Sequence, residues 1–140
     1  MRTALAALLA TLVVPGSASA AFGFSAFHSP TGKIVCVGSG DKATGKHMEL
    51  RCDISSHTWT APPQTKPCDA GDYGSSHGMT RRGSARFICV SDAPPSSKEL
   101  AYGKLWRFGP FKCRMKTTGV RCVNAAAHGW TLSRSSVKRF

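Results

Sequence analysis

The stretch Phe111–Asn124, FKCRMKTTGVRCVN, constrains the fold more than any other part of the chain. Apolar residues and cysteines alternate with Lys and Arg on both sides of a Thr-Thr-Gly turn, and a period of two predicts a β-hairpin with one buried and one exposed face. Cys113 and Cys122 lie symmetrically about the turn, so this register places them opposite each other. It also places Arg114 opposite Arg121, and like charges across a ladder are destabilising. The exposed face is therefore expected to suit an anionic partner.

Six cysteines are the second constraint on the fold. They are Cys36, Cys52, Cys68, Cys89, Cys113 and Cys122. None forms a C-x-x-C pair, which argues against a zinc ribbon and against a thioredoxin-type redox site. Of the many connectivities open to six cysteines, we favour the sequential pairs Cys36–Cys52, Cys68–Cys89 and Cys113–Cys122, because each would staple a local hairpin or loop. On the chain-entropy model each closed loop contributes roughly 3 kcal/mol.

The N-terminal segment has the organisation of an export signal. A basic start is followed by the apolar run Ala4–Val14 and by an A-x-A site that ends at Ala20. The run is too short to span a bilayer, and no later stretch is long and apolar enough to be a membrane helix. We therefore expect residues 1–20 to be a signal peptide that is cleaved after Ala20. Residues 21–140 would form a single six-cysteine β domain, secreted or periplasmic, monomeric, and without stable membrane insertion.

The rest of the chain also indicates strands. Met48–Ile54 alternates apolar and charged residues without interruption. Further strands are predicted at Lys33–Val37, Ala85–Ser91 (buried on both faces), Lys104–Phe108 and Trp130–Ser133. The remaining segments are interpreted as an aromatic lead-in at Phe22–Phe27, loops at Gly38–His47 and Cys68–Met79, and a single helical turn at Ser97–Tyr102. Without helical periodicity elsewhere, the sequence predicts an all-β fold: a small disulfide-stapled sandwich or barrel built from short antiparallel hairpins.

Positive charge is concentrated in the C-terminal third. The chain has a net charge of +12, and from Gly103 onward it contains nine Lys or Arg and no Asp or Glu. Such a field favours an anionic polysaccharide, nucleic acid or an acidic membrane surface, although a charged surface can also serve solubility alone. Trp106 and Trp130 could stack on a ligand but are expected in the core. The candidate binding residues are Arg107, Lys112, Arg114, Lys116, Arg121 and Arg134.

Catalytic motifs are lacking. No carboxylate pair, G-x-S-x-G elbow, H-E-x-x-H or phosphate-binding glycine loop occurs in the sequence. One enzymatic alternative is a ribonuclease-like hydrolase that uses His57, His128 and Lys112 for acid–base cleavage. A metal site formed by His57, His77, His128 and a loop Asp is possible on ligand type, but these residues lack the short ligand spacing that usually seeds such a site. A third class is an inhibitor or host-interaction protein that presents a rigid loop at Asp69–Arg82. We expect a binding module without catalysis, cofactor or metal.

A short pattern occurs twice. Arg-Cys at residues 51–52 is followed by His-Thr-Trp-Thr at 57–60, and Arg-Cys at 121–122 by His-Gly-Trp-Thr at 128–131. A duplicated cysteine hairpin would explain this echo. The simpler interpretation is structural: each tryptophan packs over its neighbouring disulfide, and each histidine bonds to a backbone group.

Several spaced motifs together carry a resemblance to a known family. They are Ser29-Pro30-x-Gly32-x-Ile34-x-Cys36, Arg51-Cys52-Asp53-Ile54 with Trp59 and Pro62-Pro63, Phe87-x-Cys89, Tyr102-Gly103, Phe111-x-Cys113, Gly119-Val120-x-Cys122-x-Asn124 and His128-Gly129-Trp130-x-Leu132-Ser133-Arg134. In these the chain resembles a family of small secreted bacterial proteins known only as a domain of unknown function. The resemblance implies export and one six-cysteine domain. It implies no activity, cofactor or catalytic residue.

Overall fold

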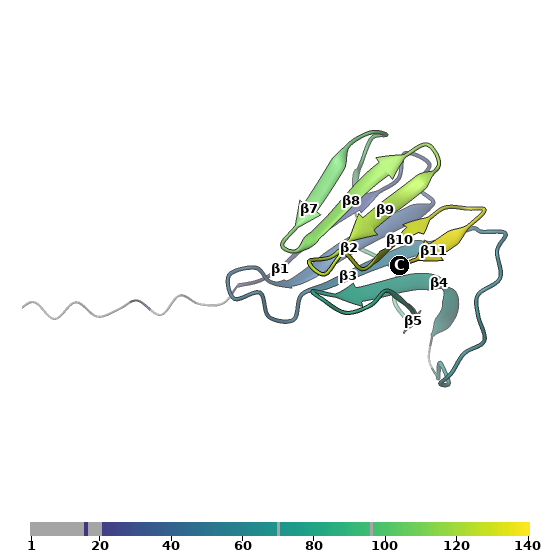
Figure 1. The fold of residues 1–140 in the computed structure, drawn as a ribbon, viewed down its shortest axis with the longest axis horizontal. Coiled ribbons are helices and arrows are strands. Elements are labelled where there is room, and N and C mark those ends of the chain that lie inside the picture. The colour runs from purple at the N-terminus through teal and green to yellow at the C-terminus, as the bar shows by residue number, and fades with distance from the viewer. Residues whose placement is uncertain (1–15, 17–20, 70, 96) are drawn as a thin grey trace, which may run out of the picture.

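Two β-sheets packed face to face make up the protein in the computed structural model (Figure 1). The structure describes residues 16, 21–69, 71–95 and 97–140. Within these residues the chain forms strands and turns but no helix, and so none long and apolar enough to cross a membrane. The expected signal peptide lies outside the described residues, apart from Gly16. The all-β prediction is confirmed, and the architecture is the sandwich.

The first sheet has six strands in the order β5-β4-β3-β2-β1-β6. Its strands are β1 (Phe22–His28), β2 (Ile34–Asp41), β3 (Glu49–Ile54), β4 (Asp72–Thr80), β5 (Arg86–Val90) and β6 (Lys98–Glu99). All neighbours are antiparallel except β1 and β6, which are parallel.

The second sheet has five antiparallel strands in the order β11-β10-β9-β8-β7. Its strands are β7 (Leu105–Phe108), β8 (Phe111–Lys116), β9 (Gly119–Val123), β10 (Gly129–Leu132) and β11 (Val137–Arg139). In Figure 1 it is the layer coloured green to yellow, and the six-stranded sheet is mainly purple to teal.

Two disulfides occupy the centre of the core. Cys36–Cys52 joins directly opposite residues of β2 and β3, and Cys113–Cys122 joins directly opposite residues of β8 and β9. The Sγ atoms of Cys52 and Cys122 lie 4.0 Å apart, so the two disulfides touch across the sandwich. The third disulfide, Cys68–Cys89, ties the segment before β4 to the edge strand β5. The structure thus confirms the sequential pairing.

The predicted hairpin is confirmed as β8 and β9. Arg114 lies opposite Arg121, one position from the paired cysteines. The turn residue Gly119 has a φ of 125°, and a Cβ atom there would collide with the carbonyl oxygen of Leu132. Glycine is therefore required at this turn. The strands predicted at Met48–Ile54, Lys104–Phe108 and Trp130–Ser133 correspond to β3, β7 and β10.

Several segments were assigned wrongly from the sequence. Cys68–Met79 is not a loop, because it contains most of β4, which pairs with β3 and β5 on its two sides. The rigid loop expected at Asp69–Arg82 is therefore absent from the described part of this segment, and the inhibitor alternative loses its presenting element. Phe22–Phe27 belongs to a strand, β1. Gly38–His47 is only partly loop because β2 continues to Asp41.

Two further assignments concern the edges of the first sheet. The strand predicted at Ala85–Ser91 is β5, but it is an edge strand with exposed residues rather than a strand buried on both faces. Ser97–Tyr102 forms no helical turn; it contains the short strand β6, which pairs with the end of β1.

The echo has a partly structural explanation. Trp130 is fully buried and lies opposite Cys122, next to its disulfide. Trp59 lies in a loop, where its Nε1–H donates to the carbonyl oxygen of Ser133 at 2.9 Å. His57 Nδ1 bonds to the carbonyl oxygen of Trp59 at 2.8 Å, as predicted. No side-chain hydrogen bond of His128 occurs within the described part of the chain, so the backbone bond is seen in one copy only.

One titratable side chain lies inside the core. His77 on β4 is fully buried opposite Cys52, and its ring centroid is 4.5 Å from that of Phe87 and 6.0 Å from that of Trp130. Neither ring nitrogen has a hydrogen-bond partner within the described residues. Burial lowers the pKa of His77 from 6.5 to about 4, and the charge of Arg139 acts in the same direction.

The disulfides give a first prediction. Replacing Cys113 and Cys122 together by Ala should lower the free energy of unfolding by about 4 kcal/mol, because a buried cross-link and its packing are both lost. Replacing Cys68 and Cys89 by Ala should cost about 3 kcal/mol, because Cys89 is exposed and only loop closure is lost. Urea unfolding of both double variants measures the difference. Loop length alone predicts the reverse order, since the separations are 9 and 21 residues.

His77 gives a second prediction. The folded protein keeps His77 neutral, whereas the unfolded chain binds a proton below about pH 6.5. This contribution to stability is therefore complete above pH 6.5 and is lost as the pH falls towards 4, by about 3 kcal/mol in total. His77→Phe should flatten the dependence of the unfolding free energy on pH between 6.5 and 4.5.

The matched control is His47→Asn. His47 is exposed and has a positive φ that Asn tolerates, so this variant should keep the parent slope. A His77→Phe protein with the parent slope would show that the pH dependence has another origin.

Candidate functional site

The outer face of the five-stranded sheet carries the predicted cations. Along β8 the residues alternate strictly, so Lys112, Arg114 and Lys116 are exposed while Phe111 and its inward-facing neighbours are buried. The apolar set packs against the six-stranded sheet, and this forces the basic set outwards.

The strands that pair with β8 place further basic side chains next to these three. Arg107 on β7 lies opposite Lys112, and Arg121 on β9 lies opposite Arg114. Arg121 is followed across the sheet by Thr131 on β10 and then by Lys138 on β11. Directly opposite residues have Cβ atoms about 5 Å apart. We call this set the basic face: Arg107, Lys112, Arg114, Lys116, Arg121 and Lys138.

No carboxylate neutralises the basic face within the described residues. Both ion pairs among the described residues belong to Arg51 of β3, in the other sheet, which binds Asp53 at 2.8 Å and Asp92, just after β5, at 2.7 Å. On the basic face, Arg114 donates to the carbonyl oxygen of Gly103, and the Arg121 guanidinium lies 4.0 Å from the ring centroid of Phe140. Neither contact involves an acidic side chain, so the charged side chains of this sheet face are all basic.

The sequence prediction and the structure differ at two cations. Arg134 does not belong to the basic face, because it lies in the turn between β10 and β11 and lines a groove beside that face. Lys138 was not predicted. Its strand has three residues, too few for a periodic pattern, and only the pairing of β11 with β10 reveals its orientation.

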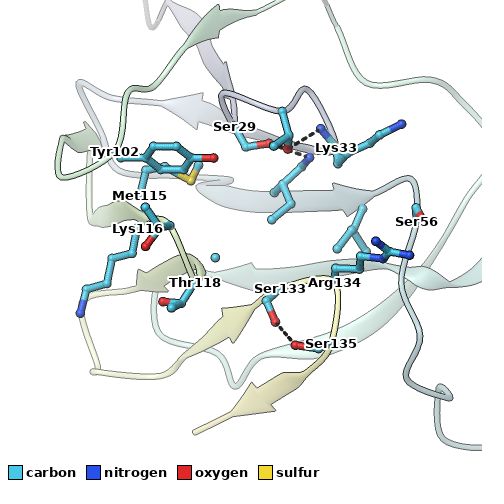
Figure 2. Close-up of a pocket in the computed structure, with 15 residues that line it drawn as sticks. Ser29, Lys33, Ser56, Tyr102, Met115, Lys116, Thr118, Ser133, Arg134 and Ser135 are labelled. Atoms are coloured by element: carbon cyan, nitrogen blue, oxygen red, sulfur yellow. Dashed lines mark hydrogen bonds between the residues drawn. The ribbon is translucent and has the colours of Figure 1, made fainter.

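A groove of about 530 Å³ lies where the two sheets separate near the β8–β9 turn (Figure 2). Its apolar residues come from both sheets, with Ile34 and Ile54 on one side and Met115 on the other. It is also lined by three cations, Lys33, Lys116 and Arg134, by the aromatic ring of Tyr102, and by no acidic residue. The hydroxyl residues that line it are Ser29, Thr31, Ser56, Thr117, Thr118, Ser133 and Ser135.

The histidines of the enzymatic alternative are anchored near different residues of β4. The ring of His57 lies near Ser75 of β4, with Nε2 and Oγ 3.4 Å apart. The turn that contains His128 is instead tied by Asn124 to the carbonyl oxygen of Thr80, at the end of β4. About 3.3 Å per strand residue places these two points of β4 on the order of 15 Å apart. No hydrogen bond or ring contact joins His57 and His128 within the described residues.

The close sulfur atoms in the core do not form a metal site either. Cys36, Cys52 and Cys122 lie together, but each is bonded in a disulfide and offers no free thiolate. Trp106 and Trp130 are core residues, as expected: Trp130 is fully buried and Trp106 is packed against the buried cluster.

Comparison with known proteins assigns a family. No curated protein and no solved structure matches the chain. A family model described as "Family of unknown function (DUF6636)" matches residues 6–140. The spaced motifs predicted membership of a domain-of-unknown-function family, and the match extends over nearly the whole sequence. The chain therefore belongs to this family of unknown function.

Proposed function

We propose that this protein is a non-catalytic binding module that holds an anionic polymer on its basic face. The observation that carries the proposal is a sheet face with six cations and, among the described residues, no carboxylate partner. Repulsion between such closely spaced like charges is relieved when an anion lies over them. A polyanion also releases bound counterions when its charges are neutralised, which makes binding strong at low salt.

The spacing of the charges supports a polysaccharide as the ligand. On one sheet face, neighbouring side chains are separated by roughly 5 Å across strands and 7 Å along them. This is comparable with the length of one sugar unit in a linear acidic polysaccharide. Single-stranded nucleic acid would call for open aromatic platforms. At the basic face, the Arg121 guanidinium lies 4.0 Å from the ring centroid of Phe140, so one face of this ring is already occupied.

The compartment is consistent with such a ligand. Three disulfides are typical of an oxidising environment. Together with the N-terminal segment, which has the pattern of a signal peptide, they support export. We therefore propose a secreted or periplasmic protein that binds an anionic polysaccharide of the cell envelope.

Charge reversal tests this function. Lys112→Glu, Arg114→Glu and Arg121→Glu combined should weaken binding to fluorescent polygalacturonate by more than about tenfold at low salt and should reduce the salt dependence of the affinity. Fluorescence anisotropy at several salt concentrations measures both quantities.

The matched control reverses three exposed cations elsewhere. Lys46→Glu, Lys66→Glu and Arg82→Glu change the net charge by the same amount but leave the basic face intact. This variant should bind within about threefold of the parent. Equal losses in the two triple variants would mean that net charge, not the basic face, governs binding. A labelled RNA of similar charge serves as competitor: tighter binding of RNA would change the ligand class, and shortened RNA would indicate catalysis.

A further inference from the structure

We infer that the groove beside the basic face binds a single acidic sugar unit, such as a hexuronate. This inference deepens the proposed function and relies on it for the class of ligand. The groove and the basic face share Lys116, so one polymer chain can lie on the face while one of its units, or its end, enters the groove.

The size and lining of the groove suit a pyranose ring. Small-molecule sites usually occupy about 300–1,000 Å³, and this groove has about 530 Å³. Its apolar part is made by Ile34, Ile54 and Met115, all three buried beneath the surface. Tyr102 stands beside Met115 with 44% of its surface exposed (Figure 2). An exposed phenol ring next to an apolar floor can pack against the C–H face of a sugar.

The cations around the groove suit the carboxylate. Figure 2 shows Lys33 and Arg134 on one side of the groove and Lys116, with Tyr102, on the other. None of these three cationic side chains makes an ion pair or side-chain hydrogen bond within the described residues. Arg can bind a carboxylate through two parallel hydrogen bonds, and Lys adds a compact positive charge. A neutral sugar would leave this charge uncompensated.

The hydroxyl groups divide into supporting and open ones. Ser29 and Ser133 are used within the protein: Ser29 Oγ accepts from Ile34 N at 3.1 Å, and Ser133 Oγ accepts from Ser136 N at 3.1 Å. In the described residues the hydroxyls of Ser56, Thr118 and Tyr102 have no such partner, so they remain available to sugar hydroxyls. Groups of this kind give orientation as well as affinity.

The backbone that carries Arg134 is held in place before any ligand binds. Thr58 N donates to the carbonyl oxygen of Arg134 at 2.9 Å, and Trp59 Nε1 donates to that of Ser133 at 2.9 Å. On the other side, Gly103 N donates to the carbonyl oxygen of Met115 at 2.8 Å, which fixes the segment that follows Tyr102. A site whose walls are already positioned loses less entropy on binding.

Other ligand sources fit the lining less well. Inorganic phosphate would satisfy the cations but leave the phenol ring and the apolar floor without a partner. An acyl chain would contact the floor but oppose the charged and hydroxyl rim. The combination of an apolar floor, open hydroxyls and uncompensated positive charge points to a sugar ring that carries an acidic group.

The test uses the oxidised full-length protein and methyl galacturonoside as the probe, followed by amide chemical shifts in nuclear magnetic resonance. Shifts should concentrate at residues 29–34, 102, 115–119 and 133–135. Methyl galactoside and inorganic phosphate should each bind at least about tenfold more weakly, since each satisfies only part of the lining. Equal affinity for phosphate, or shifts confined to the basic face, would overturn the inference.

Variants separate the groove from the basic face. Arg134→Gln and, independently, Tyr102→Ala should each weaken binding of the monosaccharide about tenfold. The matched control is Arg107→Gln, which lies on the basic face outside the groove and should bind the monosaccharide like the parent. A loss at Arg107 equal to that at Arg134 would contradict a groove site. Because both groove residues are exposed, thermal unfolding should stay close to that of the parent.

The two proposals can fail separately. If methyl galacturonoside binds in the groove but polygalacturonate does not bind the basic face, the groove stands and the proposed function falls. If polygalacturonate binds and the monosaccharide leaves the groove shifts unchanged, the inference falls and the proposed function stands.

Discussion

The contact between two disulfides is the constraint on which the sandwich depends. Each joins directly opposite residues of one hairpin, and the Sγ atoms of Cys52 and Cys122 lie 4.0 Å apart across the core. In a strand, a slip of one residue moves every inward side chain to the outer face. Cross-linked opposite residues prevent that slip in both sheets. The division between the buried apolar set and the exposed basic set is therefore fixed by covalent bonds.

This cross-link also explains how the second sheet tolerates its charge. Arg114 and Arg121 face each other one position from Cys113–Cys122, where their repulsion weakens the pairing of the strands. The disulfide keeps the strands paired, and Met115 and Val120 pack inwards on the other side of the arginine pair. A concentrated positive face can thus be held on a stable hairpin. Stability comes from the inner face, and the outer face takes no part in the core.

Alternation revealed some strands and concealed others. Phe111–Asn124 and Met48–Ile54 could be assigned because one face is buried and the other charged. β4 could not be assigned, because a central strand rich in Gly, Ser and His shows no alternation of apolar and polar residues. Gly78 occurs in this strand because a Cβ atom there would lie 2.9 Å from the side chain of Ile88. The end of β2 was hidden in the same way, since a Cβ atom at Gly38 would lie 2.7 Å from Phe108. The basic residues could be identified from the sequence as a concentration of charge. The groove could not be predicted, because it is formed by turns that are distant in the sequence and come together only when the two sheets pack.

The echo makes the charge asymmetry of the molecule plain. Arg51 and Arg121 precede equivalent cysteines and both point away from the core. Arg51 is neutralised by Asp53 and Asp92, whereas Arg121 has no carboxylate partner among the described residues. Every Asp and Glu of the chain precedes residue 103, so the five-stranded sheet carries basic residues without acidic ones. The two sheets therefore differ in net charge, although their central hairpins are built alike. A molecule with one positive side approaches an extended polyanion in one orientation. Under the proposed function, that orientation would bring Lys116, and with it the mouth of the groove, against the polymer.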